Sequence, residues 1–171
     1  MVDEAAFKDL MGAVCAPVTV VTTLTAEGRP HGTTVSSFAS LSLKPAMVTF
    51  ALDRKSELLS HLQISRKAAV NVLADGQDGV ATAFAHRGEN KFDGVDWHID
   101  EGLPRLNGIG GWMVVSVREL IDGGDHLLVI ATADRADSTD APPLIYARRT
   151  FGTHSLLAHH PQSSYVNALN L

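Results

Sequence analysis

The chain has 171 residues, of which 45% are hydrophobic and 19% charged, and these values suit a single globular domain rather than a disordered chain. Its formal net charge of -5, with no basic cluster, argues against a nucleic-acid partner, because phosphate contacts need concentrated lysine and arginine. No apolar run approaches the roughly 20 residues that a membrane-spanning helix needs, so no membrane association is expected.

The N-terminal region and the cysteine content predict a soluble cytoplasmic protein. The acidic N-terminus lacks the basic start and apolar core of a signal peptide. Cys15 is the single cysteine, which excludes an intrachain disulfide and fits a reducing compartment. Because its neighbours Ala13, Val14 and Ala16 are apolar, we expect Cys15 to be a small buried hydrophobe.

The first predicted elements are a helix and two strands. Asp3 can cap an amphipathic helix that Pro17 would end. Residues 18–24 are rich in β-branched side chains and predict a strand, which a turn at 27–30 connects to a second strand over 32–38. The apolar residues of the helix follow helical spacing: Phe7, Leu10, Met11 and Val14.

The middle of the chain alternates strands and short helices. Residues 47–52 form a third strand, whose apolar composition predicts burial on both faces. A helix over 56–64, a strand over 68–73 and a short helix over 79–85 follow. Residues 86–111 contain so many glycines and prolines that we expect a long irregular loop, which is often functional.

The late part of the chain predicts three more strands, over residues 112–120, 126–133 and 144–146. A polar loop is expected over 134–143. Hairpin connections dominate and no long βαβ series is present, which indicates a mainly β protein with an antiparallel barrel and peripheral helices. We expect one domain over residues 1–155 and a C-terminal tail or arm over 156–171.

Two segments carry polar groups that suit a phosphorylated ligand. Thr34 and Ser36 share one face of an extended strand, so one ligand could use both, although a threonine-rich strand needs no ligand. Residues 53–56 lie between a strand end and a helix start, where free N–H groups, Lys55 and the Ser56 hydroxyl suit a phosphate. An ordinary polar loop with Ser56 as the helix cap is the alternative.

Other common sites lack support in the sequence. The eight histidines are scattered without metal-ligand spacing, so no metal site is expected. The sequence contains no glycine-rich dinucleotide motif, nucleophile elbow or P-loop. His126 follows the tight turn Gly123-Gly124-Asp125, where it could meet a cofactor or simply begin a strand.

Taken together, these segments resemble the short-chain flavin reductases, the reductase partners of two-component flavin monooxygenases, which have the FMN-binding split-barrel fold. The resemblance runs from about Phe7 to Phe151. It rests on an ordered series of motifs: Pro17-Val-Thr-Val-Val-Thr-Thr23, Gly32-Thr-Thr-Val-Ser-Ser-Phe38, Ser40-Leu-Ser-Leu-Lys-Pro45, Ala69-Val-Asn-Val-Leu73, Lys91-Phe92 with Trp97, Gly102-Leu-Pro104, Gly124-Asp125-His126 and Pro143-Leu-Ile-Tyr146.

The resemblance implies an antiparallel split β-barrel that transfers hydride from NAD(P)H to FMN or FAD. His126 would be the catalytic residue, near the nicotinamide and flavin N5, and Tyr146 would lie beside the nicotinamide. The other implied cofactor-binding residues are Thr34, Val35, Ser36 and Ser37 at the ring edge and ribityl chain, Ser40 and Ser42 beside the isoalloxazine, Lys55 and Ser56 at the phosphate, Asp53 in the same segment, and Phe84 and Phe92 near the cofactor.

The resemblance further implies a homodimer with the cofactor at its interface, and a flavin-dependent monooxygenase that receives reduced flavin. Three alternatives stay open: another split-barrel FMN oxidoreductase, a flavin carrier or sensor without turnover, and a split-barrel haem protein. The sequence does not choose between FMN and FAD, or between NADH and NADPH.

Overall fold

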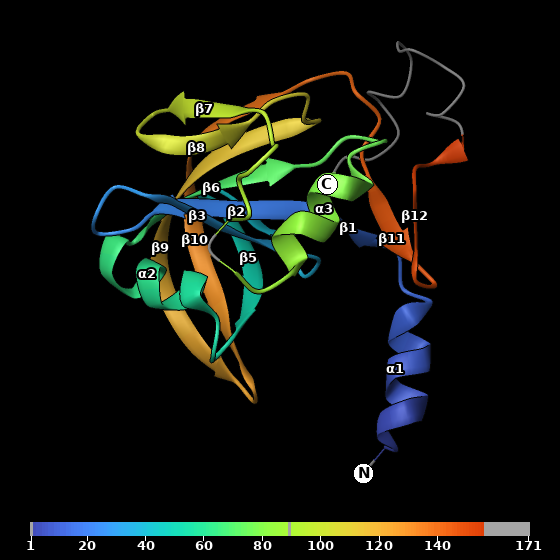
Figure 1. Cartoon of the computed structure of the whole chain (residues 1–171). Helices are drawn as coiled ribbons and strands as arrows, with labels where there is room; N and C mark the ends of the chain where they lie inside the picture. The colour runs from blue at the N-terminus through green and yellow to red at the C-terminus, as the bar shows by residue number, and fades with distance from the viewer. Residues whose placement is uncertain (1, 89, 156–171) are drawn as a thin grey trace.

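A computed structural model describes residues 2–88 and 90–155 of the chain. A curved antiparallel sheet dominates it, with short helices at its margins (Figure 1). The elements in chain order are α1 (Glu4–Gly12), β1 (Ala16–Pro17), β2 (Thr19–Leu24), β3 (Pro30–Val35), β4 (Ala39–Leu43), β5 (Ala46–Asp53), α2 (Glu57–Ser65), β6 (Lys67–Val72), α3 (Asp78–Ala85), β7 (Trp97–Asp100), β8 (Leu103–Leu106), β9 (Gly111–Gly123), β10 (His126–Ser138), β11 (Ile145–Ala147) and β12 (Thr150–Gly152).

The main sheet has seven strands in the order β3-β2-β6-β9-β10-β5-β4, and each neighbouring pair is antiparallel. The sheet curls until the end of β3 approaches β5. There the Ser37 hydroxyl accepts a hydrogen bond from the Ala51 backbone N–H at 2.9 Å and lies 3.3 Å from the Ala51 carbonyl. The predicted fold class, mainly β and antiparallel, is confirmed.

Apolar side chains fill both faces of this sheet. The cluster inside the curl includes Val21, Phe50 and Val115, and α2 covers it with Leu58 and Leu62, which are fully buried. The second cluster lies on the opposite face, under α3 and the β7–β8 hairpin. Its largest members are Phe84, Trp112, Leu73, Leu106 and Leu144.

The β7–β8 hairpin corrects the expectation of an irregular loop over residues 86–111. Gly102 supplies the positive φ of its turn, 76°. The hairpin is held to the barrel by a buried polar contact, because the Leu106 N–H donates to Asn71 Oδ1 at 2.9 Å and Asn71 Nδ2 donates to the Val20 carbonyl at 3.1 Å. The glycines that suggested irregularity therefore make turns between short strands.

Several predicted strand boundaries change for the same reason, which is cross-strand pairing. β10 continues to Ser138, into the first part of the segment expected to be a polar loop, because β9 pairs with it along its whole length. Strands β4 and β12 were not predicted, and β3 ends at Val35, before the predicted 38. In β5 only alternate residues such as Phe50 are fully buried, so the prediction of burial on both faces is wrong.

Helix α1 projects from the barrel (Figure 1). Asp3 caps it as predicted, accepting a hydrogen bond from the Ala6 N–H at 3.0 Å, but the helix ends at Gly12 rather than at Pro17. No residue of α1 is buried, and Cys15 is exposed, so its predicted burial is wrong. In the described part of the chain, no helix is long and apolar enough to cross a membrane.

Candidate functional site

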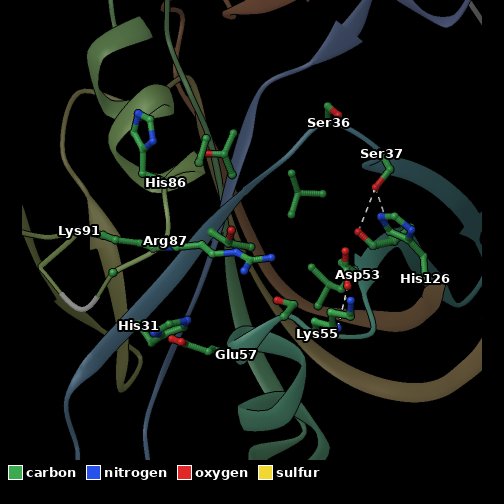
Figure 2. A pocket seen from close by; sticks show the side chains of 18 residues that line it. His31, Ser36, Ser37, Asp53, Lys55, Glu57, His86, Arg87, Lys91 and His126 are labelled. Carbon is green, nitrogen blue, oxygen red and sulfur yellow. Dashed lines mark hydrogen bonds between the residues drawn. The ribbon is translucent and has the colours of Figure 1, made fainter. Parts of the chain in front are cut away.

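A cavity of about 470 Å³ opens where the end of β3, the end of β5, the start of α2 and the start of β10 meet. Figure 2 shows its side chains converging from these separate elements. Eight of the predicted site residues line it: Thr34, Val35, Ser36, Ser37, Asp53, Lys55, Ser56 and His126. Residues from both segments singled out in the sequence, 33–37 and 53–56, therefore line one cavity.

The other predicted site residues do not line this cavity. Ser40 and Ser42 lie on β4, and Tyr146 lies on β11, where its ring packs 4.8 Å from that of Phe151. The rings of Phe84 and Phe92 are 4.8 Å apart in the second apolar cluster. Phe84 instead supports β3 from behind, because a Cβ added at Gly32 would lie only 3.0 Å from its ring.

Hydrogen bonding divides the hydroxyls of the β3 wall into used and free groups. Thr34 Oγ1 donates to the Ala81 carbonyl at 2.6 Å, so its proton fastens α3 and only its oxygen can accept from a ligand. The Ser37 hydroxyl is already hydrogen-bonded to the Ala51 backbone. Among the residues that the structure describes, the Ser36 hydroxyl has no hydrogen-bond partner, and it is free to bond a ligand.

The β5–α2 loop presents its donors to the cavity because Asp53 folds it back. The Asp53 carboxylate accepts from the Lys55 N–H at 2.7 Å, and the Asp53 carbonyl accepts from the Ser56 N–H at 2.9 Å. Ser56 occupies the N-cap position of α2 but makes no side-chain cap bond, so its hydroxyl can serve a ligand. A hydroxyl, an ammonium group and a helix N-terminus together suit a phosphate.

His126 is the first residue of β10 and pairs across the sheet with Asp53. Its Nδ1 lies 2.7 Å from Oδ1 of Asp125, and this hydrogen bond lowers the pKa of the Asp125 carboxyl. The imidazole is partly exposed at the cavity wall, with Lys55 and Asp53 beside it (Figure 2).

The opposite end of the cavity holds cationic and imidazole groups that the sequence did not single out as ligand-binding. Arg87 points into the cavity from the segment after α3 (Figure 2). Lys91 is fixed, because its Nζ donates to the carbonyls of Gly32 at 3.1 Å and Phe84 at 3.2 Å, and burial lowers its pKa. Only the Lys91-Phe92 motif gave any signal for this end, which also includes His31, Glu57 and His86.

The groups present fit a phosphorylated flavin. Free hydroxyls and N–H groups can serve the polar edge of a ring and its ribityl chain, and the cations can serve phosphate oxygens. Within residues 2–88 and 90–155, no cluster of three or more His, Cys, Asp or Glu side chains could hold a metal ion.

The flavin reductase like domain matches residues 11–155 of the chain. The chain belongs to this family. A probable flavin reductase from Rhizobium meliloti is 33% identical over 90% of this chain. The chain spans only 50% of the length of that relative. A reductase subunit of a flavin-dependent monooxygenase from Mycobacterium tuberculosis is 32% identical, over 86% of this chain and 80% of that protein.

Solved structures agree with the assignment to the flavin reductase family. An NADH:FAD oxidoreductase from Streptomyces globisporus, in complex with NAD and FAD fragments, superposes with a TM-score of 0.85 and 28% identity, covering 90% of this chain and 93% of that one. The split-barrel fold and the oxidoreductase class are therefore confirmed for this flavin reductase.

The half-buried His31 should make folding stability depend on pH. Burial, followed by the nearby His61 and Lys91, lowers the pKa of His31 from its usual 6.5, against the opposing effect of Glu57. Near pH 6 the unfolded chain therefore binds more protons than the folded chain. The free energy of unfolding has its full value above pH 6.5 and decreases as the pH drops through the folded-state pKa of His31. His31→Asn should reduce this fall, measured as urea midpoints at about pH 7.5 and about pH 5.5. An equal midpoint shift in both proteins would contradict the assignment.

Proposed function

We propose that the protein transfers hydride from NADH or NADPH to FMN or FAD held in this cavity. One observation carries the proposal: the β5–α2 loop, the free Ser36 hydroxyl and His126 converge on a single cavity. A bound flavin would supply the redox chemistry, and the protein would supply binding and orientation.

The β5–α2 loop would hold the flavin phosphate. Lys55 gives a positive charge, Ser56 gives an uncommitted hydroxyl, and α2 begins beside them at Glu57, which also lines the cavity. Charge-assisted hydrogen bonds of this kind are the strong ones in proteins. The ribityl chain and ring would then lie toward Ser36 and the end of β3.

His126 would lie beside the reacting atoms and orient the nicotinamide. If its Nδ1–H donates to Asp125, the ring presents the Nε2 lone pair to a ligand amide or hydroxyl. Because the ring is part of the cavity wall and only half exposed, it can contact a ligand without a rearrangement of β10.

We further propose that reduced flavin leaves the cavity for a flavin-dependent monooxygenase. The support is the Mycobacterium tuberculosis relative, which is named as the reductase subunit of such an enzyme. The polar lining favours exchange as well, because hydroxyls and charged groups are well hydrated when the cavity is empty.

The exposed apolar residues support a homodimer. Phe7, Leu10 and Met11 stand on one side of α1 with 51%, 65% and 47% of their surface exposed, an apolar stripe that nothing in the described chain covers. On edge strand β4, Leu41 and Leu43 are also exposed. Ser40, Ser42 and Tyr146 lie outside the cavity of one chain. In a dimer formed through these surfaces, a cofactor at the interface could contact them.

Hydride transfer can be measured by anaerobic stopped-flow absorbance of FMN or FAD mixed with NADH or NADPH. We expect rapid bleaching in the wild-type protein, and a loss of about 10-fold to 100-fold in rate for His126→Ala, because orientation of the reactants is lost. The dissociation constant of the flavin should change little. Flavin binding without bleaching by either nucleotide would instead favour a carrier or sensor.

Lys55→Ala should weaken FMN binding by about 10-fold or more, because a charge-assisted hydrogen bond contributes about 1.5–3 kcal/mol. Riboflavin has no phosphate, so its affinity should be unchanged. Fluorescence titration of both ligands gives the comparison, and Lys44→Ala, on the exposed β4–β5 turn outside the cavity, is the control. Equal losses for FMN and riboflavin would show that Lys55 does not bind the phosphate.

Light scattering should give the mass of two chains for the wild-type protein. Leu10→Glu combined with Met11→Glu should shift the mass to one chain, because charged groups would enter the apolar interface. Ile64→Glu, on the exposed side of α2, is the control and should stay dimeric. A wild-type mass of one chain at all concentrations would exclude the homodimer.

A further inference from the structure

The β9–β10 turn (residues 122–125) is fastened to the neighbouring β5–α2 loop by Arg54. Arg54 Nε donates to the Gly124 carbonyl at 2.8 Å, and Arg54 Nη2 lies 2.7 Å from Oδ1 of Asp122. The Arg54 backbone N–H donates to the Asp125 carbonyl at 3.1 Å. We call these three contacts the Arg54 clamp.

The position of Arg54 in the chain separates it from the ligand-binding side chains. Its neighbours Asp53 and Lys55 line the cavity, whereas Arg54 does not and turns instead to the β9–β10 turn. The guanidinium also uses two of its donors on the turn, and its charge is paired with Asp122. Arg54 is therefore not placed as a further phosphate ligand.

The clamp acts on the residue that orients His126. In the described chain, the contact with Asp125 is the one hydrogen bond of the His126 ring. The Asp125 side chain is exposed, so no packing fixes it, and its direction depends on the backbone of the turn. The Arg54 N–H holds that backbone at the Asp125 carbonyl, and the Arg54 guanidinium holds it at the Gly124 carbonyl.

The clamp contributes little to overall stability. The side chains of Arg54 and Asp122 are 45% and 84% exposed, and ion pairs this accessible to water are weak. Its effect is local: it limits the motion of a hairpin end that contains the positive-φ Gly124 and leads directly into His126. Loss of the clamp should widen the range of His126 orientations without unfolding the barrel.

We propose that Arg54 is a positioning residue, which holds the β9–β10 turn so that Asp125 aims His126 into the cavity. The proposal rests on the hydride-transfer function proposed above. It also joins the two halves of the site, because the loop that presents Lys55 to the phosphate is the loop that holds the turn before His126.

A double-mutant cycle on the full-length protein tests the proposal, with FMN and NADH or NADPH in anaerobic stopped flow. Arg54→Ala should slow hydride transfer by about 5-fold to 30-fold, since small misorientations are costly in rate. Asp122→Asn and Arg54→Lys, which each remove part of the clamp, should have intermediate effects. Thermal unfolding and the FMN dissociation constant should stay near wild type.

The decisive comparison is Arg54→Ala in the His126→Ala background, where it should have no further effect on the rate. Arg118→Ala is the matched control, because Arg118 is an exposed arginine on the same hairpin with its own side-chain bond, to Thr132 at 3.1 Å, and should retain the wild-type rate. An undiminished loss in the His126→Ala background would overturn the clamp while leaving the proposed function intact.

Two other outcomes would also overturn the clamp. A drop in FMN affinity with unchanged riboflavin affinity would make Arg54 a phosphate ligand instead. A wild-type rate for His126→Ala alone would remove both the clamp and the role of His126 in the proposed function.

Discussion

The antiparallel pairing of β5 with β10 is the constraint on which the site depends. Its register sets His126 opposite Asp53, so the end of one strand and the beginning of the other meet at the same edge of the sheet. The loop after Asp53 must then lie beside the turn before His126, whatever the loop sequences are. A slip of one residue would turn His126 to the other face, because side chains alternate along a strand.

Two packed layers keep that edge in place. The curl of the sheet is filled by one apolar cluster and closed by α2, and the opposite face is covered by α3 and the β7–β8 hairpin. Asn71 lies buried on the hairpin side of β6 and bonds backbone groups of both β2 and β8. Since an unpaired buried amide is costly, this contact determines where the hairpin sits as well as strengthening it.

The fold and the site draw on the same polar residues. In the sequence, Thr34, Ser36 and Ser37 are equivalent hydroxyl residues. In the structure, Thr34 bonds to α3 and Ser37 joins the end of β3 to β5. The hydroxyls left for a ligand are the smaller set with no partner in the described chain, Ser36 and Ser56 in the cavity lining. Binding capacity is thus decided by which hydroxyls the barrel does not need.

The sequence by itself determined the antiparallel β class, most strand positions, and the two polar segments that became cavity walls, because β-branched runs, turn glycines and cap residues act locally. The family resemblance added His126. Only the tertiary structure brought Arg87 and Lys91 to the cavity, revealed the Arg54 clamp, and left α1 and Cys15 exposed. These features depend on contacts between residues far apart in the chain, and an apolar pattern shows that a face can be buried without showing what will cover it.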